Sequence, residues 1–387
     1  MSAKASNREY QVISTDDHVV EPPNVWQSRL PAHLRDSGPK MVSTGEADVW
    51  EIAGERYPIS GLAAMAGRSF EDYTPKAIRL EDMRPGCYDS VARLEDMDED
   101  GVDAQVLFGT IAGLAGGTFI DLASKHAELA LECIIAYNDW LASEWCAKDP
   151  GRLVPQAILP LWDPGASAEE VERAASIGHR GILIPAIPQA FGLPPLADDA
   201  YTPVLDACSN TGLPVALHIG GSIARKQAAE LAGGLTPGSG VPGETIVAIT
   251  PLANFSVFAN LIFSGIPERH PNVDFVSVES GIGWVPYFLE RMDWTYTRHR
   301  FWTKSTLKDL PSNYFRRQMY ATFLVDDTGI DALDAIGSKN VMWESDYPHT
   351  DTTWPNSKQI IEEHLGHLDA GVRHQVLAGN AQRVYGL

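Results

Sequence analysis

The sequence predicts an α/β protein that folds as a distorted (β/α)₈ TIM barrel, and three observations support this prediction. Short apolar runs rich in β-branched residues alternate with longer stretches of helical periodicity along most of the chain. Eight of these runs are of the strand type, one for each strand of such a barrel. No switch point divides the runs into two halves, as an open doubly wound sheet would require. The 387 residues are therefore expected to form one barrel domain, 1–387.

The eight predicted strands follow one another along the whole chain. They cover residues 12–15, 104–108, 154–159, 181–185, 214–217, 273–278, 318–324 and 340–343. In a barrel the carboxyl ends of all strands surround one mouth, which is where active sites are built.

Helical periodicity separates these strands. Between the second and third strands Ile134, Tyr137, Leu141 and Trp145 recur at spacings of three and four, which predicts a helix. This helix should stop at Asp149-Pro150-Gly151, because proline and glycine both break helices. Further crossover helices are predicted over residues 168–177, 202–210, 283–300 and 357–368.

Two insertions interrupt the alternation, one after the first strand and one after the fifth. The first covers residues 22–93 and contains a predicted hairpin over 48–59 that turns at Ala53-Gly54. The second covers residues 220–243, is rich in glycine and is expected to be a flexible loop or lid. Residues 1–11 are expected to form a flexible N-terminal arm.

Acidic residues outnumber basic ones by a wide margin. The chain has 51 Asp and Glu against 30 Lys and Arg, which gives a formal net charge of −21. Such a charge repels phosphate backbones and anionic lipids, so neither nucleic acid nor a membrane is expected as a partner.

The sequence also carries signals about the compartment. Its start is polar and lacks the apolar core of a signal peptide, and the longest apolar stretch, 104–120, is too short and glycine-rich to predict a membrane span. The four cysteines lie far apart without a Cys-x-x-Cys pattern, which indicates reduced thiols. We therefore expect a cytoplasmic protein.

Histidine and acidic residues stand at the ends of four predicted strands. Asp16 and His18 close the first strand and, being two residues apart, should point to the same side. His218 ends the fifth strand, Glu279 follows the sixth and Asp346 follows the eighth. Taken singly, each is better explained as a capping carboxylate or a hydrogen-bonded histidine. Their shared placement at one mouth instead favours a metal site, because two imidazoles and two or three carboxylates suit Zn²⁺.

Several short motifs occur in a characteristic order. They are Asp16-x-His18-x-x-Glu21-Pro22 near the start, Leu217-His218 after the fifth strand, and Ser345-Asp346-Tyr347-Pro348-His349 near the end, with Asn138-Asp139-Trp140 and residues 159–161 and 380–387 as further matches. In this order they resemble the amidohydrolase-2 family, in the branch that contains aminocarboxymuconate-semialdehyde decarboxylase and related decarboxylases and hydrolases. The resemblance covers nearly the whole chain.

The resemblance implies one divalent metal ion at the barrel mouth, with Zn²⁺ expected first and Mn²⁺ or Fe²⁺ as alternatives. Carried over by position, the ligands are Asp16, His18, His218 and Asp346. Asp346 would also orient the metal-bound water or accept its proton. Binuclear members of the superfamily carry a carboxylated lysine after the fourth strand, whereas residues 184–186 here read Ile-Pro-Ala, so a single ion is implied. The resemblance alone implies a homo-oligomer, and a dimer is expected.

The sequence departs from the family's decarboxylases at one position. In those enzymes a histidine stands nine residues after the His-Pro pair that precedes the sixth strand; here the pair is His270-Pro271 and the position is Glu279. Glutamate is poorly suited to polarise an anionic substrate, but it can serve as a general base or an additional ligand. His349 stands three residues after Asp346 and has two possible roles. It could contact the substrate or act as an acid or base, or it could stabilise the Tyr347-Pro348 turn.

These residues favour one function and leave two alternatives open. The favoured function is a mononuclear metal-dependent hydrolase that acts on a small organic substrate through a metal-activated water, with Asp346, Glu279 and His349 as catalytic residues. The first alternative is a metal-dependent nonoxidative decarboxylase of a small aromatic or unsaturated carboxylic acid. The second is a barrel that lacks catalytic activity and serves as a scaffold.

Overall fold

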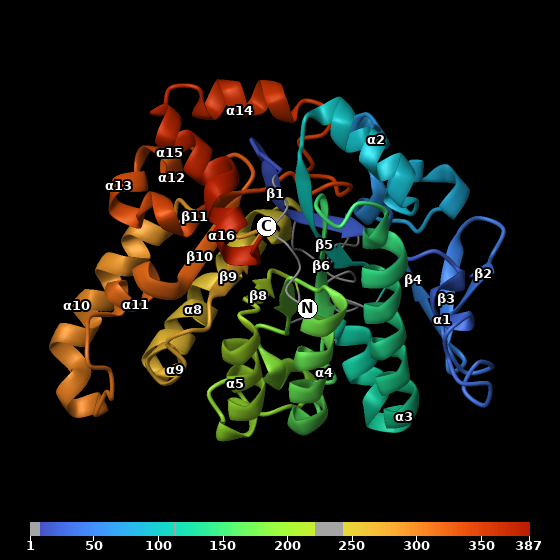
Figure 1. Cartoon of the computed structure of the whole chain (residues 1–387), viewed down its shortest axis with the longest axis horizontal. Coiled ribbons are helices and arrows are strands. Elements are labelled where there is room, and N and C mark those ends of the chain that lie inside the picture. Colours follow the sequence, from blue (N-terminus) through green and yellow to red (C-terminus); the bar gives the residue numbers. More distant parts are fainter. Residues whose placement is uncertain (1–7, 112–113, 221–242) are drawn as a thin grey trace.

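Eight parallel strands form the centre of the computed structural model, which describes residues 8–111, 114–220 and 243–387 (Figure 1). They pair in the order β1-β5-β6-β7-β8-β9-β10-β11. Their bounds are β1 Ile13–Val19, β5 Ala104–Gly109, β6 Leu153–Ile158, β7 Gly181–Leu183, β8 Val215–His218, β9 Phe275–Val278, β10 Met319–Phe323 and β11 Val341–Trp343. All eight predicted strands and the predicted barrel are thus confirmed.

The first and last strands meet and nearly close the barrel. Thr15 Oγ1 donates to the carbonyl of Trp343 at 2.9 Å, and the amide of His18 donates to the carbonyl of Tyr347 at 2.6 Å. Asp17 and Tyr347 also form a parallel bridge. These contacts place the start of β1 beside the segment that follows β11, although more than 300 residues separate them in sequence.

Helices surround the strands (Figure 1). The predicted helix with a period of three to four is α3, Gly117–Trp140, and it continues through Leu141–Trp145 before the break at Asp149. Within the described residues the other α-helices are α1 Asn24–Gln27, α2 Ser90–Asp100, α4 Pro164–Ile177, α5 Thr202–Thr211, α7 Gly243–Ile249, α8 Ala253–Phe263, α9 Ile266–Arg269, α10 Val285–Thr303, α11 Pro311–Gln318, α12 Asp327–Asp331, α13 Leu333–Ile336, α14 Ser357–Leu365, α15 Ala370–His374 and α16 Asn380–Tyr385. None of the helices in the described part of the chain is both long and apolar enough to span a lipid bilayer.

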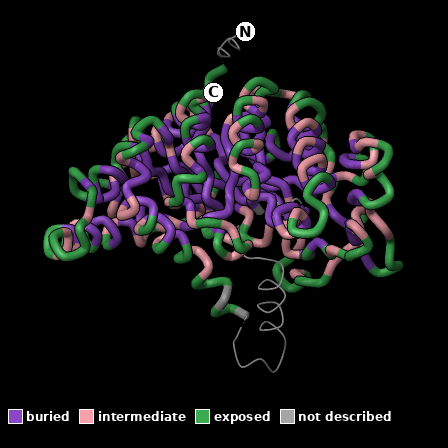
Figure 2. The backbone as a smooth tube through the Cα atoms, turned by 90° about the horizontal axis from the view of Figure 1, so that it is seen from below, coloured by how far each residue is buried: buried purple, intermediate pink, exposed green. Residues whose placement is uncertain are grey.

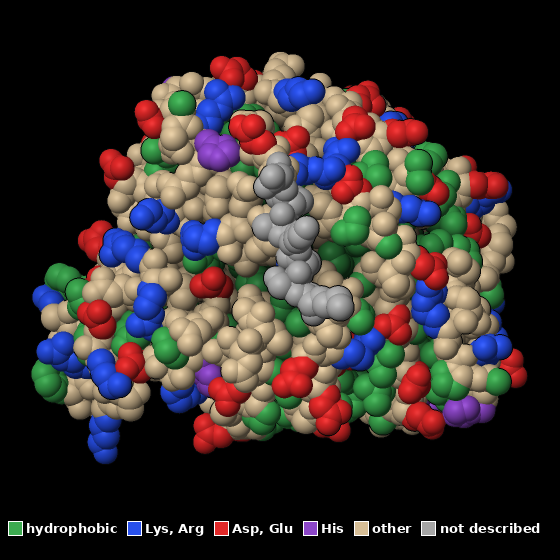
Figure 3. Space-filling model, viewed as in Figure 1, with side chains coloured by type: hydrophobic (Ala, Val, Ile, Leu, Met, Phe, Trp, Pro, Cys, Tyr) green, Lys and Arg blue, Asp and Glu red, His purple; other side chains and the backbone are tan. Residues whose placement is uncertain are grey.

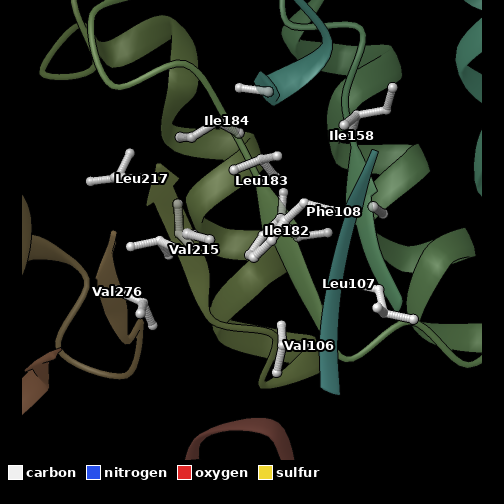
Figure 4. Close-up of a cluster of buried hydrophobic side chains, with 14 of the residues drawn as sticks. Val106, Leu107, Phe108, Ile158, Ile182, Leu183, Ile184, Val215, Leu217 and Val276 are labelled. Atoms are coloured by element: carbon white, nitrogen blue, oxygen red, sulfur yellow. The ribbon is translucent and has the colours of Figure 1, made fainter. Parts of the chain in front are cut away.

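The core lies inside the barrel and between the strands and the helices. Figure 2 shows buried residues through the middle of the molecule and exposed residues on its outside. Figure 4 shows part of this core, built by side chains from neighbouring strands: Val106, Leu107, Phe108, Ile158, Ile182, Leu183, Ile184, Val215, Leu217 and Val276. A filled interior leaves the mouth as the place for a site.

The insertion over 22–93 folds as a small antiparallel sheet of β2 (Lys40–Ser43), β3 (Asp48–Ile52) and β4 (Glu55–Pro58). The predicted hairpin is β3-β4, and its two turn residues, Ala53 and Gly54, both have positive φ values, 49° and 81°. Such a two-residue turn matches the right-handed twist of the strands it joins. Strand β2 was not predicted.

Residues 8–11, expected to belong to a flexible arm, are anchored instead. Tyr10 is buried and its hydroxyl donates to the carbonyl of Gly151 at 2.6 Å, while Arg8 pairs with Asp149 at 3.1 Å. Residues 1–7 lie outside the described residues, as do 221–242, which make up nearly all of the expected loop or lid over 220–243.

Charged side chains of both signs are scattered over the face of the molecule in Figure 3. The net charge of −21 is therefore not gathered into one acidic area on this face.

Candidate metal centre

Strand ends at the barrel mouth bring together the four predicted ligands, all of them buried. Asp16 and His18 lie on β1, and His218 is the last residue of β8. His218 Nε2 lies 3.2 Å from Asp16 Oδ1 and 3.3 Å from His18 Nε2. Asp346 follows β11 and brings its Oδ1 to 3.6 Å from His18 Nε2. The structure thus gathers nitrogen and oxygen donors from three strands into one small volume.

Two overlapping groups of donors are close enough to hold one ion. The donor atoms of Asp16, His18 and His218 all lie within 4.8 Å of one another, and so do those of His18, Asp346 and His349. The His349 ring stacks on the His18 ring, with centroids 3.8 Å apart, and His349 Nδ1 lies 2.8 Å from Asp346 Oδ1. His349 therefore lies in this cluster.

The His218 ring is oriented by its own backbone. Its Nδ1 donates to the carbonyl of Ile219 at 2.6 Å, which leaves the lone pair on Nε2 facing Asp16 and His18. Metal-binding histidines characteristically donate their second ring nitrogen in this way, which fixes the tautomer. Glu279 Oε2 lies 3.6 Å from the same Nδ1.

Asp346 and Glu279 share an unusual backbone conformation. Their φ values are 51° and 57°, in the left-handed region that residues other than glycine seldom adopt. Each is held there by a hydrogen bond from its own amide: Asp346 donates to the carbonyl of Asp16 at 2.9 Å, and Glu279 to Thr322 Oγ1 at 2.9 Å. Strained residues of this kind cluster at functional sites, where the surrounding structure holds them in place.

Acidic groups crowd together at this mouth. Burial raises the pKa of Asp346 well above its usual range, and the charges of Glu279, Asp16 and Glu344 raise it further. Burial also raises the pKa of Asp16, but His218 and His18 outweigh it and hold the pKa below the usual range. Conversely, burial lowers the pKa of His218, yet Asp16 and Glu279 raise it to about 9. The repulsion among the carboxylates and their attraction to His218 thus both favour positive charge at this mouth.

Two carboxylate oxygens indicate that a cation fits this cluster. Asp16 Oδ2 and Asp346 Oδ2 are buried and find no hydrogen-bond partner among the residues that the structure describes. Buried charges without partners are costly, and a divalent ion between two imidazoles and two carboxylates would satisfy these oxygens. The donor set suits Zn²⁺, Mn²⁺ or Fe²⁺.

Sequence reasoning missed a network that joins β1 to the segment after β11. Asp17 points away from the cluster, and its Oδ1 accepts hydrogen bonds from Gln105 Nε2 at 3.0 Å, Ser345 Oγ at 2.6 Å and the Tyr347 amide at 3.1 Å. Since Asp346 lies between Ser345 and Tyr347, this network holds it opposite Asp16.

Arg93 of α2 belongs to the same support and was also missed. Its guanidinium is fully buried and donates to the carbonyls of His18 and Gly86 and to Gln105 Oε1. It also lies 4.2 Å from the centroid of the Tyr347 ring. No local motif marks Arg93, because its role depends on how the insertion packs against β1.

Glu344 is a further missed carboxylate. It is fully buried behind Asp346, and its pKa is raised well above the usual range, first by burial and then by the charge of Asp16. Its position two residues before Asp346 was a usable signal, because alternate residues near a strand point to the same side.

A cavity of about 330 Å³ opens beside the cluster. Asp346, Glu279 and His349 line its inner end. The rest of its wall comes from the first insertion and from segments after β8 and β11, and comprises Ser60, Leu62, Ala63, Ile219, Gly220, Val247, Thr250, Pro251, Thr350 and Asp351. A larger cavity of about 380 Å³, near Trp140 and Pro22, contains none of the predicted site residues. We therefore take the smaller one, which touches the cluster, as the candidate binding site.

Other motif residues serve the framework of the barrel. Asn138 Nδ2 donates to the carbonyl of Ile158 at 2.9 Å, and its Oδ1 accepts from the Ile158 amide at 3.1 Å. Asn380 Nδ2 donates to the carbonyls of Ser338 and Val341. Glu21 accepts from the amides of Thr110 and Ile111, so its carboxylate stabilises the loop after β5.

Comparison with known proteins agrees with this geometry. The profile of the amidohydrolase family matches residues 30–387, a span that includes His218 and Asp346 and begins after His18. Gamma-resorcylate decarboxylase of Rhizobium sp. strain MTP-10005 is 27% identical over 286 residues, which cover 70% of this chain and 81% of the relative.

Solved structures share the fold at lower sequence identity. An amidohydrolase from Mycobacterium avium subsp. paratuberculosis is 21% identical with a TM-score of 0.75, covering 98% of this chain and all of the other. The 5-carboxyvanillate decarboxylase of Novosphingobium aromaticivorans, solved with manganese and 4-hydroxy-3-methoxy-5-nitrobenzoic acid, is 18% identical with a TM-score of 0.69 and covers 98% of this chain and 97% of its own. The family profile covers more than nine-tenths of the sequence, and the barrel with its strand order agrees with that match. The chain therefore belongs to the amidohydrolase family.

Proposed function

We propose that this protein is a metal-dependent nonoxidative decarboxylase of a small aromatic or unsaturated carboxylic acid. One divalent ion would be held by Asp16, His18, His218 and Asp346. Two of the three proteins named above, gamma-resorcylate decarboxylase and 5-carboxyvanillate decarboxylase, are decarboxylases, which supports this reaction over the hydrolysis that Glu279 alone favours. The hydrolase becomes the second candidate.

The observation that carries the proposal is that the cluster of predicted ligands borders a cavity of small-molecule size that opens to the surface. A volume of about 330 Å³ is at the lower end of the range for small-molecule sites, so it suits a substrate of about one ring. Leu62, Ala63, Ile219 and Pro251 provide apolar wall, while Asp346 and His349 lie at the cluster end. An apolar ring and a carboxylate directed to the metal match these two ends.

The residues at the cluster end match what decarboxylation requires. When bound, the ion would supply positive charge for the substrate carboxylate and an adjacent oxygen. Loss of CO₂ leaves an electron pair on the substrate carbon, which must then accept a proton. Asp346 Oδ1 and His349 Nδ1, 2.8 Å apart, form the pair that would hold this proton beside the cavity. The apolar wall would exclude water from the carbon.

The identity of the metal ion can be determined by reconstituting the metal-free protein with single ions. Zn²⁺ suits two histidines and two aspartates, and the Novosphingobium structure contains manganese, so both ions are candidates, with Fe²⁺ as a third. The metal is removed and each ion is then added singly, at one ion per chain. Activity should return, and the initial rates should be highest with one of the three ions.

Hydrolysis is favoured by one specific observation. Glu279 lines the cavity with its carboxylate 3.6 Å from His218 Nδ1, and burial raises its pKa. A carboxylate with a raised pKa in this position is suited to accept a proton from water. For the decarboxylase, Glu279 would instead be a positioning residue for His218.

One experiment distinguishes the two reactions. The metal-loaded enzyme is incubated with a panel of hydroxylated benzoic acids and matching esters and amides in H₂¹⁸O, and CO₂ and ¹⁸O in the products are measured by mass spectrometry. We expect CO₂ from at least one free acid, with a product that has gained hydrogen and no ¹⁸O. Release of an ¹⁸O-labelled acid from esters or amides, without CO₂, would establish hydrolysis instead. A metal-free chain inert toward the whole panel would support the scaffold.

A further inference from the structure

The outer face of α10 carries a line of exposed aromatic side chains. Tyr287, Trp294 and Phe301 are spaced seven residues apart and are 65%, 50% and 77% exposed, and Trp302 beside them is 73% exposed. Seven residues make nearly two helical turns, so the three rings lie along one line of the helix. The opposite face is buried and also apolar, with Val285, Phe288, Leu289, Met292 and Tyr296. A helix that is apolar on both faces is typical of one packed between two partners.

This helix is placed where a second molecule has access to it. It lies at the outer edge of the molecule, away from the strands (Figure 1, Figure 2). Its inner face contacts α8, α11 and α13, while its outer face stays exposed in the described part of the chain. Figure 3 shows hydrophobic and basic side chains gathered at this protruding end.

Two opposite charges on this face lie at equal distances from Trp294, whereas exposed Arg291 has uncharged Thr297 as its counterpart. Exposed Glu290 lies four residues before Trp294, and exposed Arg298 lies four residues after it. The Arg298 guanidinium also stacks over the Trp294 ring, 3.4 Å from its centroid. The aromatic residues Tyr287 and Phe301 are likewise equidistant from Trp294 in sequence. A face with this symmetry is complementary to itself when turned by 180°.

We propose that α10 is the self-association face of this protein and that two copies pair antiparallel about a twofold axis at Trp294. Glu290 of one copy then faces Arg298 of the second, and Tyr287 faces Phe301. The twofold axis generates each of these contacts twice. Such an isologous contact uses one patch on both molecules. Two acidic chains would otherwise repel, and the Arg side chains of α10 reduce that repulsion at the contact.

The apolar area is sufficient for the centre of a dimer contact. Four aromatic side chains exposed to this extent offer roughly 400–600 Å² per chain, since each can bury about 150–250 Å² in full. A standard interface buries about 800 Å² per partner, with the rest supplied by a polar rim. Neighbouring charged residues of α10 can provide that rim.

The first test is the oligomeric state of the metal-loaded full chain, measured by sedimentation velocity over a range of concentrations. We expect a dimer for the wild type. The substitution Trp294→Glu would place two carboxylates at the axis and should raise the dissociation constant at least about 30-fold, as for a central interface residue. Val91→Glu, at an exposed apolar position on α2, is the matched control and should leave the dimer unchanged.

The second test examines the antiparallel pairing itself. Glu290→Arg places like charges opposite Arg298 twice, and Arg298→Glu does the same for Glu290, so each should weaken the dimer about tenfold. The double variant restores opposite charges and should return the dissociation constant to within about threefold of the wild type. Failure of the double variant to recover would overturn the antiparallel arrangement.

Two further results would overturn the proposal as a whole. One is a wild-type chain that remains monomeric at all concentrations, which would assign the aromatic face to a different partner. The other is an oligomer that Trp294→Glu leaves intact, which would place the contact elsewhere. Retention of the folded state by each variant is checked by circular dichroism.

Discussion

At the scale of single residues, His218 is the most informative side chain of the site. Its Nδ1 donates to the carbonyl of Ile219, and its Nε2 faces Asp16 and His18. The backbone thus fixes the direction of the ring, and Nε2 would face a metal ion held by this cluster. Histidines without this arrangement serve as internal controls.

Replacing His218 tests whether it is a ligand. His218→Ala should lower the metal content from about one ion per chain to less than 0.1 and weaken metal binding by about 100-fold or more, since it removes a direct ligand. The measurement is elemental analysis after dialysis, together with activity. His33→Ala, an exposed histidine paired with Glu128, should retain the full metal content. Unchanged metal content in His218→Ala would refute the assigned ligand set.

Residue spacing predicted which residues form the cluster but only part of their support. His218 ends β8 and Asp346 follows β11, as the sequence pattern predicted, whereas Asp16 and His18 lie within β1, which continues to Val19. Asp17 and Arg93 escaped notice because their partners lie on distant segments: Asp17 contacts Ser345 and Tyr347, and Arg93 contacts the carbonyl of His18. Contacts of this kind depend on the closure of the barrel, and no local pattern encodes them.

At the scale of elements, Asn138 joins α3 to the carboxyl end of β6. Its side chain satisfies both backbone groups of Ile158 and donates to Glu170 of α4 at 2.6 Å. Because Ile158 is buried, losing the Asn138 amide removes hydrogen bonds from its backbone N–H and carbonyl that water cannot replace.

Asn138→Ala should therefore destabilise the fold by about 2–4 kcal/mol, because a buried amide and a buried carbonyl lose their hydrogen bonds. Urea denaturation measures the free energy of unfolding. Asn313→Ala, at an exposed position on α11, provides the comparison and should change it by less than about 0.5 kcal/mol. Equal effects of the two substitutions would contradict the role given to Asn138.

Elements were predictable where their pattern is local. All eight barrel strands are short apolar runs, and the β3-β4 hairpin is marked by Ala53-Gly54. Strand β2 has only two apolar residues, Met41 and Val42, and becomes a strand by pairing with β3. Residues 8–11 are polar enough to suggest a mobile arm, but Tyr10 is buried against Gly151 by tertiary contacts.

At the scale of the whole molecule, the buried acidic cluster links metal binding to stability. Asp16, Asp346 and Glu344 are fully buried and mutually close, so a bound ion would offset their repulsion in the folded state only. The ion should therefore stabilise the fold by mass action.

Chelation tests this link. Removal of the metal should lower the melting temperature by about 5–10 °C, and adding one ion per chain should restore it. Differential scanning calorimetry is the measurement. His218→Ala should melt at nearly the same temperature with and without the chelator. A wild type that does not respond to chelation would show that no ion bridges these carboxylates.

A second property of the whole molecule is its stability at mildly acidic pH. Burial lowers the pKa of His179 to about 4, and its Nε2 donates to the carbonyl of Asn138 at 3.0 Å. As the pH falls below about 6.5, this residue becomes protonated in the unfolded chain but stays neutral in the folded chain. The stability should therefore fall between about pH 6.5 and pH 4, by up to about 3 kcal/mol from this group.

The variant His179→Gln isolates this contribution, because glutamine does not titrate and retains an N–H donor. The free energy of unfolding is measured in urea at several pH values between 4.5 and 7. The wild type should lose stability more steeply than the variant as the pH falls. Parallel pH profiles would exclude His179 as the source.

One divalent ion is proposed to occupy the cluster of Asp16, His18, His218 and Asp346. Anomalous diffraction at the absorption edge of the bound metal, from crystals of the metal-loaded protein, tests this most directly. We predict one peak within about 2.5 Å of His18 Nε2, of His218 Nε2 and of a carboxylate oxygen of both aspartates. A peak elsewhere, two peaks at the mouth, or none in protein that releases CO₂ from its substrate would contradict the account.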